Sequence, residues 1–174
     1  MDRVILPTSS IPTSWFKFIL RKLNIFLWRF RLDSLPVRGN LSAKGTEIHS
    51  IVCPVCNNEV ESRDHLFFEC DLARDLWHKL RVWFNVAMPS FVSWDTFISW
   101  IEGVRLSTTN TYRIIASVIT LLWVIWRFRN DVVFDESFCN RSSLFDLIRL
   151  FSFRWLKHRG HLVSNWNSWL AMPL

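Results

Sequence analysis

Apolar side chains recur at helical spacing from Ser14 onward, which predicts an amphipathic helix over residues 14–31. Its apolar face consists of Phe16, Ile19, Leu20, Leu23, Phe26, Leu27 and Phe30. At about 100° per residue, the opposite side is polar and carries Lys17, Arg21, Lys22, Asn24 and Arg29. Trp28 lies within this polar arc. An indole among cations can stack on an unpaired base, or it can pack on a neighbouring element beside a solvated helix face.

Proline, glycine and capping residues delimit the helices that follow. Pro36 ends the first helix because it disfavours helical geometry at Leu35. Residues 37–44 are predicted to form a short helix that Gly45 closes in a left-handed conformation. Two further helices are expected over 72–84, with Asp71 as N-cap, and over 94–102, between Ser93 as N-cap and Gly103. Residues 1–13 read as a disordered tail, 46–52 as an extended lead and 104–110 as a polar loop.

The longest predicted helix spans residues 112–130, and residues 114–126 are almost all apolar. A membrane span needs about 20 such residues, and arginines flank this run on both sides, so we expect a buried central helix. Ser142 or Ser143 begins a last helix to about Lys157, and the tail from His161 shows no clear period. Strand-like alternation is almost absent. The sequence therefore predicts a mainly α protein of five or six helices, with at most a short hairpin at its cysteines.

Composition and charge suggest partners. The chain has 174 residues, of which 50% are hydrophobic, with 11 Trp and 15 Phe against 4 Gly. This is more apolar bulk than one core needs, so we expect some to form a partner surface. Formal charge is +5 over residues 1–52, −4 over 53–102 and +5 over 103–174. The basic flanks favour nucleic acid or another anionic partner.

Three of the four cysteines lie in one stretch, Cys53-x2-Cys56-x8-His65-x4-Cys70. Three thiolates and one imidazole form the tetrahedral donor set of closed structural zinc sites, so zinc is expected to stabilise the fold without catalysing a reaction. A disulfide and free structural thiols are the alternatives. The N-terminus has no apolar signal-peptide core, which disfavours the disulfide and suggests an intracellular protein of the nucleus or cytoplasm. Cys139 has no evident partner and reads as an ordinary thiol.

The residues around this stretch resemble the zinc-binding domain of plant LINE-type (non-LTR) retrotransposon reverse transcriptases. The resemblance rests on FLWRFRLDSLPVRGNLSAKG, CPVC, Glu61, the HLF run from His65, Cys70, Ala73 and Leu76-Trp77, and on a later segment with Trp123, Trp126, Arg129, Asn130 and Phe134. It implies a zinc-binding domain over 14–103, a helical extension over 104–174 and a role in handling template RNA. Val37 and Gly39 depart from the family pattern and are expected to weaken the short helix there.

Catalytic signatures are absent from the sequence. There are no two adjacent aspartates to place the metal ions of a reverse transcriptase, no ribonuclease H carboxylate cluster, and no Walker motif. We therefore expect a non-catalytic module with zinc held by Cys53, Cys56, His65 and Cys70. RNA is expected to bind at Lys17, Arg21, Lys22, Trp28 and Arg29, away from the acidic cysteine stretch. A protein-interaction piece that docks on a polymerase core or another partner and a retroelement relic remain as alternatives.

Overall fold

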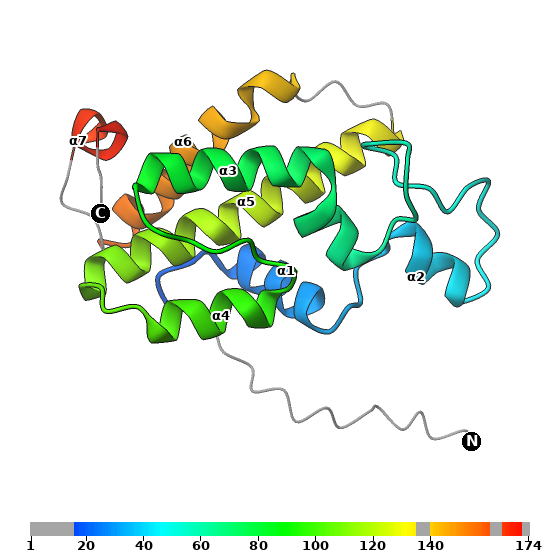
Figure 1. Ribbon diagram of the computed structural model, residues 1–174, viewed down its shortest axis with the longest axis horizontal. Helices are drawn as coiled ribbons and strands as arrows, with labels where there is room; N and C mark the ends of the chain where they lie inside the picture. Colours follow the sequence, from blue (N-terminus) through cyan, green and yellow to red (C-terminus); the bar gives the residue numbers. More distant parts are fainter. Residues whose placement is uncertain (1–15, 135–139, 161–164, 172–174) are drawn as a thin grey trace.

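The computed structural model describes residues 16–134, 140–160 and 165–171, and confirms a mainly α fold (Figure 1). Its helices are α1 Arg21–Arg31, α2 Arg38–Ala43, α3 Asp71–Phe84, α4 Trp94–Gly103, α5 Thr108–Phe134, α6 Leu144–His158 and α7 Trp166–Leu170. A π-helical turn, η1, spans His65–Glu69, and a 3₁₀ turn, η2, spans Arg141–Ser143. Within the described residues, strand pairing is limited to one antiparallel bridge between Val52 and Val60. It lies at the predicted hairpin.

Helix α5 forms the centre of the fold, as predicted, and α1, α3, η1 and α6 all pack against it (Figure 1). Every residue from Arg113 to Leu122 is buried. The argument from length was wrong, however, because α5 has 27 residues and is long and apolar enough to cross a membrane. Burial is the more informative observation, since 67% of its most apolar stretch is covered by the protein. That is consistent with the core helix of a soluble protein.

The first helix is shorter than predicted, and Asn24 explains why. The helix begins at Arg21, and Asn24, which was expected on the exposed polar side, is buried. Its side chain accepts a hydrogen bond from the backbone N–H of Phe16 and donates one to the Phe16 carbonyl, which holds the preceding residues in a turn. The helix ends at Arg31, before Pro36, because Asp33 adopts a left-handed conformation with φ 49°. Ser14 lies outside the described residues.

Other boundaries differ by a residue to one turn. Asp71 is the first residue of α3 and not its N-cap, a position that Cys70 takes. Helix α5 starts at Thr108, so the second half of the predicted 104–110 loop is helical. Ser93 caps α4 through the backbone N–H of Thr96, as expected. The predicted tail over 1–13 and Cys139 lie outside the described residues, whereas the predicted irregular C-terminus contains the short helix α7.

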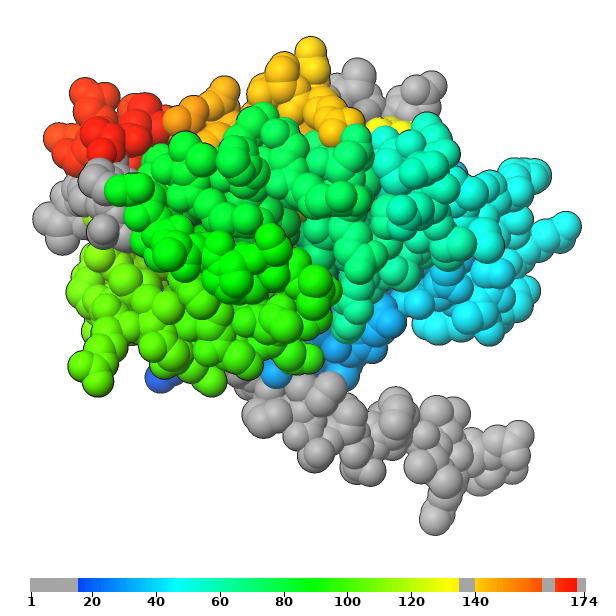
Figure 2. Space-filling view, in the orientation of Figure 1, coloured from blue at the N-terminus to red at the C-terminus, as the bar shows by residue number. Residues whose placement is uncertain are grey.

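Most of the aromatic bulk is used inside the protein. A single core includes residues of α1, η1 and α3 to α7. Among the aromatic residues that the structure describes, only Trp28 and Phe134 are exposed, at 47% and 67%. The segment from α2 to the hairpin at Val52–Val60 projects as a lobe at the end of the molecule opposite α7 (Figure 2).

Candidate metal centre

The first half of the cysteine stretch is a tight reversal between the bridge residues Val52 and Val60. The backbone N–H of Cys53 donates to the Glu59 carbonyl at 2.7 Å, which closes the loop. Inside it, the N–H of Asn57 donates to the Cys53 carbonyl at 2.9 Å, and Asn57 is left-handed with φ 54°. This turn brings Cys53 and Cys56 to the same side of the loop.

The second half explains the spacing of His65 and Cys70. Residues five apart in an α-helix point about 140° away from each other. Here the chain forms the π-helical turn η1, in which the backbone N–H of Cys70 donates to the His65 carbonyl at 2.7 Å. The wider turn places both side chains at one centre. Cys70 lies at the N-cap position of α3, whereas His65 is the first residue of the separate turn η1.

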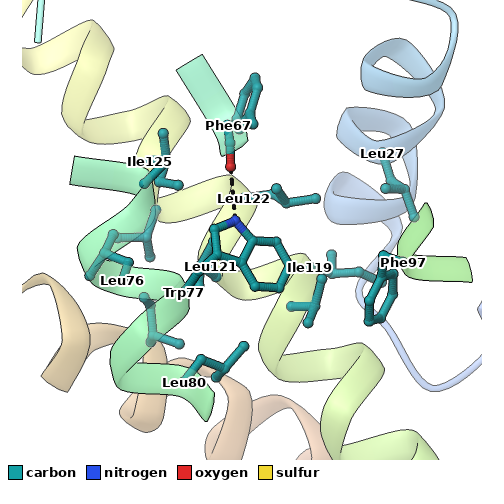
Figure 3. Close-up of a cluster of buried hydrophobic side chains, with 14 of the residues drawn as sticks. Leu27, Phe67, Leu76, Trp77, Leu80, Phe97, Ile119, Leu121, Leu122 and Ile125 are labelled. Carbon is teal, nitrogen blue, oxygen red and sulfur yellow. Dashed lines mark hydrogen bonds between the residues drawn. The ribbon is translucent and has the colours of Figure 1, made fainter. Parts of the chain in front are cut away.

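Helix α3 stabilises this π-helical turn through side-chain hydrogen bonds. The indole N–H of Trp77 donates to the Phe67 carbonyl at 2.9 Å (Figure 3). The Nε of Arg74 donates to the Glu69 carbonyl. Trp77 is only 2% exposed and sits among leucine and isoleucine side chains of α3 and α5. A π-helical turn leaves carbonyls without their usual helical donors, and these two side chains supply replacements.

The structure brings all four predicted ligands together. The three sulfur atoms and one imidazole nitrogen lie within 4.8 Å of one another. Cys56 Sγ is 3.4 Å from His65 Nε2, close to the roughly 3.5 Å that sulfur and nitrogen would have on one tetrahedral zinc. Cys53, His65 and Cys70 are buried and Cys56 is half-buried. Donor types, separations and burial all fit a closed zinc site.

The surroundings of Cys53 and Cys70 change the pKa values of their thiols in opposite directions. The thiol of Cys70 hydrogen bonds to Cys53, and the backbone N–H groups of Cys56 and Val55 also point at the Cys53 sulfur, so the pKa of Cys53 falls to about 5 despite burial. The same interaction, together with burial, raises the pKa of Cys70 above its ordinary value. One thiolate is thus present at neutral pH, and a metal would take the place of the proton on Cys70.

A buried ion pair next to this centre was not predicted. Glu61 is 0% exposed and Arg129 of α5 is 4% exposed. Arg129 Nε and Nη2 donate to the two carboxylate oxygens, each at 2.7 Å. The backbone N–H of Arg38 adds a third bond to the same carboxylate at 2.6 Å. Both partners lie among the residues of the family resemblance, but neither its spacing nor its pattern shows that they meet.

The predicted RNA-binding residues are only partly on one surface. Arg21, Lys22, Trp28 and Arg29 all lie on α1 and are exposed. Lys17 is exposed but precedes the helix, so its placement on the helical face was wrong. The apolar face on the other side of α1 is buried as expected and includes Leu23, Phe26, Leu27 and Phe30.

Lys22 has a defined neighbour. Its Nζ lies over the ring of Trp123 in α5 at 5.2 Å from the ring centre, and the guanidinium of Arg127 lies at the same distance. Trp123 is itself held edge-on by Phe151 and Trp155 of α6. This places Lys22 at the seam between α1 and α5, while Trp28 lies on a different part of the α1 surface, since six residues correspond to about 120° from Lys22 around the helix.

Comparison with known proteins agrees with this centre. Residues 6–77 match a family model described as zinc-binding in reverse transcriptase. No curated protein and no solved structure matches the chain. The matched segment contains all four candidate ligands, α1, α2, η1 and the first half of α3, and stops before α5. Residues 6–77 are therefore similar to the zinc-binding segment of reverse transcriptases, and one core joins them to helices that the match does not cover.

Proposed function

We propose that this protein is a zinc-stabilised, non-catalytic module of a plant LINE-type retroelement that binds single-stranded RNA inside the cell. The family match and the Cys3His cluster support the zinc-binding part of this proposal. The absence of adjacent aspartates from the sequence supports a role without polymerase chemistry.

In this proposal Cys53, Cys56, His65 and Cys70 hold one zinc ion, which crosslinks the hairpin to the start of α3. Binding of zinc to peptides of this kind contributes roughly 10–16 kcal/mol at neutral pH. Four protein ligands leave no position for a reacting water, so the role of the metal is to hold the lobe together. Three thiolates also leave the bound site net negative, and Glu59, Glu69 and Asp71 are exposed around it. Phosphates are therefore expected to avoid the lobe.

The observation that carries the RNA-binding part is the exposed surface of α1. Trp28 is 47% exposed on a helix whose sequence, RKLNIFLWRFR, contains four cations and no acidic residue. Arg21 and Trp28 are seven residues apart, as are Lys22 and Arg29, so each pair lies on nearly one line along the helix. Cations beside an aromatic ring suit phosphate contact and base stacking on a single strand.

Titration of the zinc-loaded protein with single-stranded RNA at several salt concentrations tests the proposal. The affinity is expected to fall as salt rises, and Arg21→Ala should lower the slope of log K against log salt by about one unit. Arg105→Ala is the matched control, because Arg105 is exposed in the loop before α5 and far along the chain from α1. RNA binding that does not depend on salt, or equal effects of the two variants, would contradict the proposal.

Docking of a protein partner is the second candidate. Ile25 is 44% exposed beside Trp28 on α1, so the same surface has apolar as well as basic character. A reverse transcriptase core or another protein could use it. In that case RNA titration shows no response, while Trp28→Ala weakens the protein complex. A retroelement relic without selected function would show neither response.

A further inference from the structure

We propose that Glu59 is a positioning residue for the metal centre, which fixes the ring orientation and the tautomer of His65 so that its Nε2 atom faces the zinc. The inference rests on the proposed zinc ligation. Glu59 Oε2 lies 3.3 Å from His65 Nδ1, and Cys56 Sγ lies 3.4 Å from His65 Nε2. The two ring nitrogens thus face opposite ways, one toward the thiolates and one toward the carboxylate.

His65 needs this contact because of where its ring lies. The side chain is 5% exposed, and Nδ1 forms no hydrogen bond with any described residue in its present geometry. A nitrogen that ligates zinc must be unprotonated, so the single proton of a neutral imidazole sits on Nδ1. Metal-ligating histidines commonly donate this proton to a carboxylate or carbonyl. The Glu59 carboxylate stands 3.3 Å away, so a small rotation of either side chain completes the bond.

Glu59 also connects the two halves of the ligand set. Its backbone carbonyl accepts the 2.7 Å hydrogen bond from Cys53 and closes the hairpin, while its side chain reaches His65 in η1. The neighbouring residue, Val60, pairs with Val52 and fixes the register of the hairpin. One residue therefore couples the position of the Cys53–Cys56 half to the orientation of the histidine.

Glu69 is the rival carboxylate. Ligand atoms of Glu59, His65 and Glu69 lie within 4.8 Å of one another, which is also close enough for a second divalent cation. Both roles cannot hold at once, because Nδ1 either carries the proton donated to Glu59 or binds a second ion. A single zinc with three thiolates needs only the neutral imidazole, and this favours the positioning role.

The test measures zinc release from the loaded protein to an excess of chelator. Glu59→Ala is expected to release zinc about tenfold faster, at the low end of the 10–100-fold range for lost outer-shell partners, because Glu59 is 58% exposed. Glu59→Gln, which keeps an acceptor, should fall between Glu59→Ala and the native chain. Glu69→Ala is the matched control for loss of a nearby negative charge and should change the rate less than twofold.

A spectroscopic signature separates positioning from charge. In ¹H–¹⁵N spectra the His65 Nδ1 proton should exchange slowly with water in the native protein and in Glu69→Ala, and faster in Glu59→Ala. Equal release rates for Glu59→Ala and Glu69→Ala would overturn the inference, as would a second equivalent of metal that Glu59→Ala removes. Zinc bound with a native release rate in Glu59→Ala overturns this inference alone, whereas a native chain that binds no zinc also overturns the proposed function.

Discussion

Arg129 and Glu61 form a two-point ion pair across 68 residues of sequence, with both N–O distances at 2.7 Å and both side chains buried. Glu61 directly follows the Val52–Val60 bridge, and Arg129 lies near the end of α5. Arg129 also donates to the Pro36 carbonyl at 3.3 Å. The pair therefore ties the metal lobe and the chain before α2 to the central helix, which lies beyond the segment that matches the family.

Removing one partner of this pair should be costly. Arg129→Ala is expected to destabilise the protein by about 3–5 kcal/mol, because it leaves the Glu61 carboxylate buried without its counter-ion. Arg141→Ala is the control, since Arg141 and Asp71 form a 3.0 Å pair with side chains 45% and 58% exposed. Its cost should stay below about 1 kcal/mol. Urea unfolding of the zinc-loaded variants measures both, and similar midpoints would show that the buried pair contributes little.

Gly39 lies close to the backbone of Glu61, where a larger side chain does not fit. A Cβ at this position would lie 2.7 Å from the Glu61 carbonyl oxygen, to which the Gly39 N–H already donates at 3.0 Å. Gly39→Ala should therefore destabilise the protein, although alanine normally favours a helix by about 1 kcal/mol over glycine. Gly103→Ala in α4 meets nothing within 4 Å and should be neutral or stabilising. Thermal unfolding that moves both variants in the same direction would contradict the close approach.

Trp77 should stabilise the π-helical turn through its indole N–H. Trp77→Phe keeps an aromatic ring but leaves the buried Phe67 carbonyl without its donor, at an expected cost of about 1–3 kcal/mol. Trp83→Phe is the control, because Trp83 is only partly buried and its bond to the Leu170 carbonyl is long, at 3.3 Å. Zinc release should also be faster in Trp77→Phe, since Phe67 lies between His65 and Cys70. An unchanged release rate in a destabilised Trp77→Phe would show that the turn does not depend on this bond.

Zinc affinity should rise with pH. Cys70, whose pKa is raised, carries a proton at neutral pH in the metal-free protein, and zinc must displace it. Each proton released on binding raises the affinity about tenfold per pH unit, so log K should increase with a slope of at least one near pH 7. Below about pH 5 Cys53 is protonated as well, which should make the slope steeper. Chelator competition across pH 4.5–8 measures this, and an affinity independent of pH would argue against thiolate ligands.

Local patterns predicted the helices well because their cause is local. The Ser93 cap, the left-handed Gly45 and the buried apolar face of α1 each depend on a few neighbouring residues. The clustering of Cys53, Cys56, His65 and Cys70 was also predictable, because donor type and spacing are properties of the sequence. The first residue of α1 could not be predicted in this way. The hydrogen bonds between the Asn24 side chain and the Phe16 backbone form a turn before the helix, and the spacing of apolar residues gives no sign of this turn.

Features that depend on distant segments were harder to predict. Gly39 looked like a weak helical position, but its reason lies in the carbonyl of Glu61. The partner of Glu61 comes from α5, and no local pattern pairs residues 68 positions apart. The spacing of His65 and Cys70 predicted that their side chains meet, without revealing the π-helical turn that brings them together. In each case tertiary packing decides what the residue does.

Substitution of Trp28 distinguishes most directly between an RNA-binding role and a structural role of this side chain. Trp28 is 47% exposed, so Trp28→Ala should leave the melting temperature nearly unchanged. Stacking of one base contributes about 1–3 kcal/mol, so the same change should weaken single-stranded RNA binding roughly ten- to a hundredfold. Phe134→Ala is the matched control, because Phe134 is also an exposed aromatic, at 67%, but lies at the end of α5. It should leave the RNA affinity within about twofold if binding requires the α1 surface.

The two measurements on Trp28→Ala must be read together. A lower affinity with an unchanged melting temperature supports base stacking by the indole, because loss of the ring then affects binding and not folding. A lower melting temperature with unchanged affinity would mean that the buried half of the ring stabilises α1, and that RNA binds elsewhere. The exposed cations of α6, Arg154 and Lys157, would then be the next surface to test by the same salt titration. Equal loss of affinity in Trp28→Ala and Phe134→Ala would indicate nonspecific contact with exposed aromatic rings.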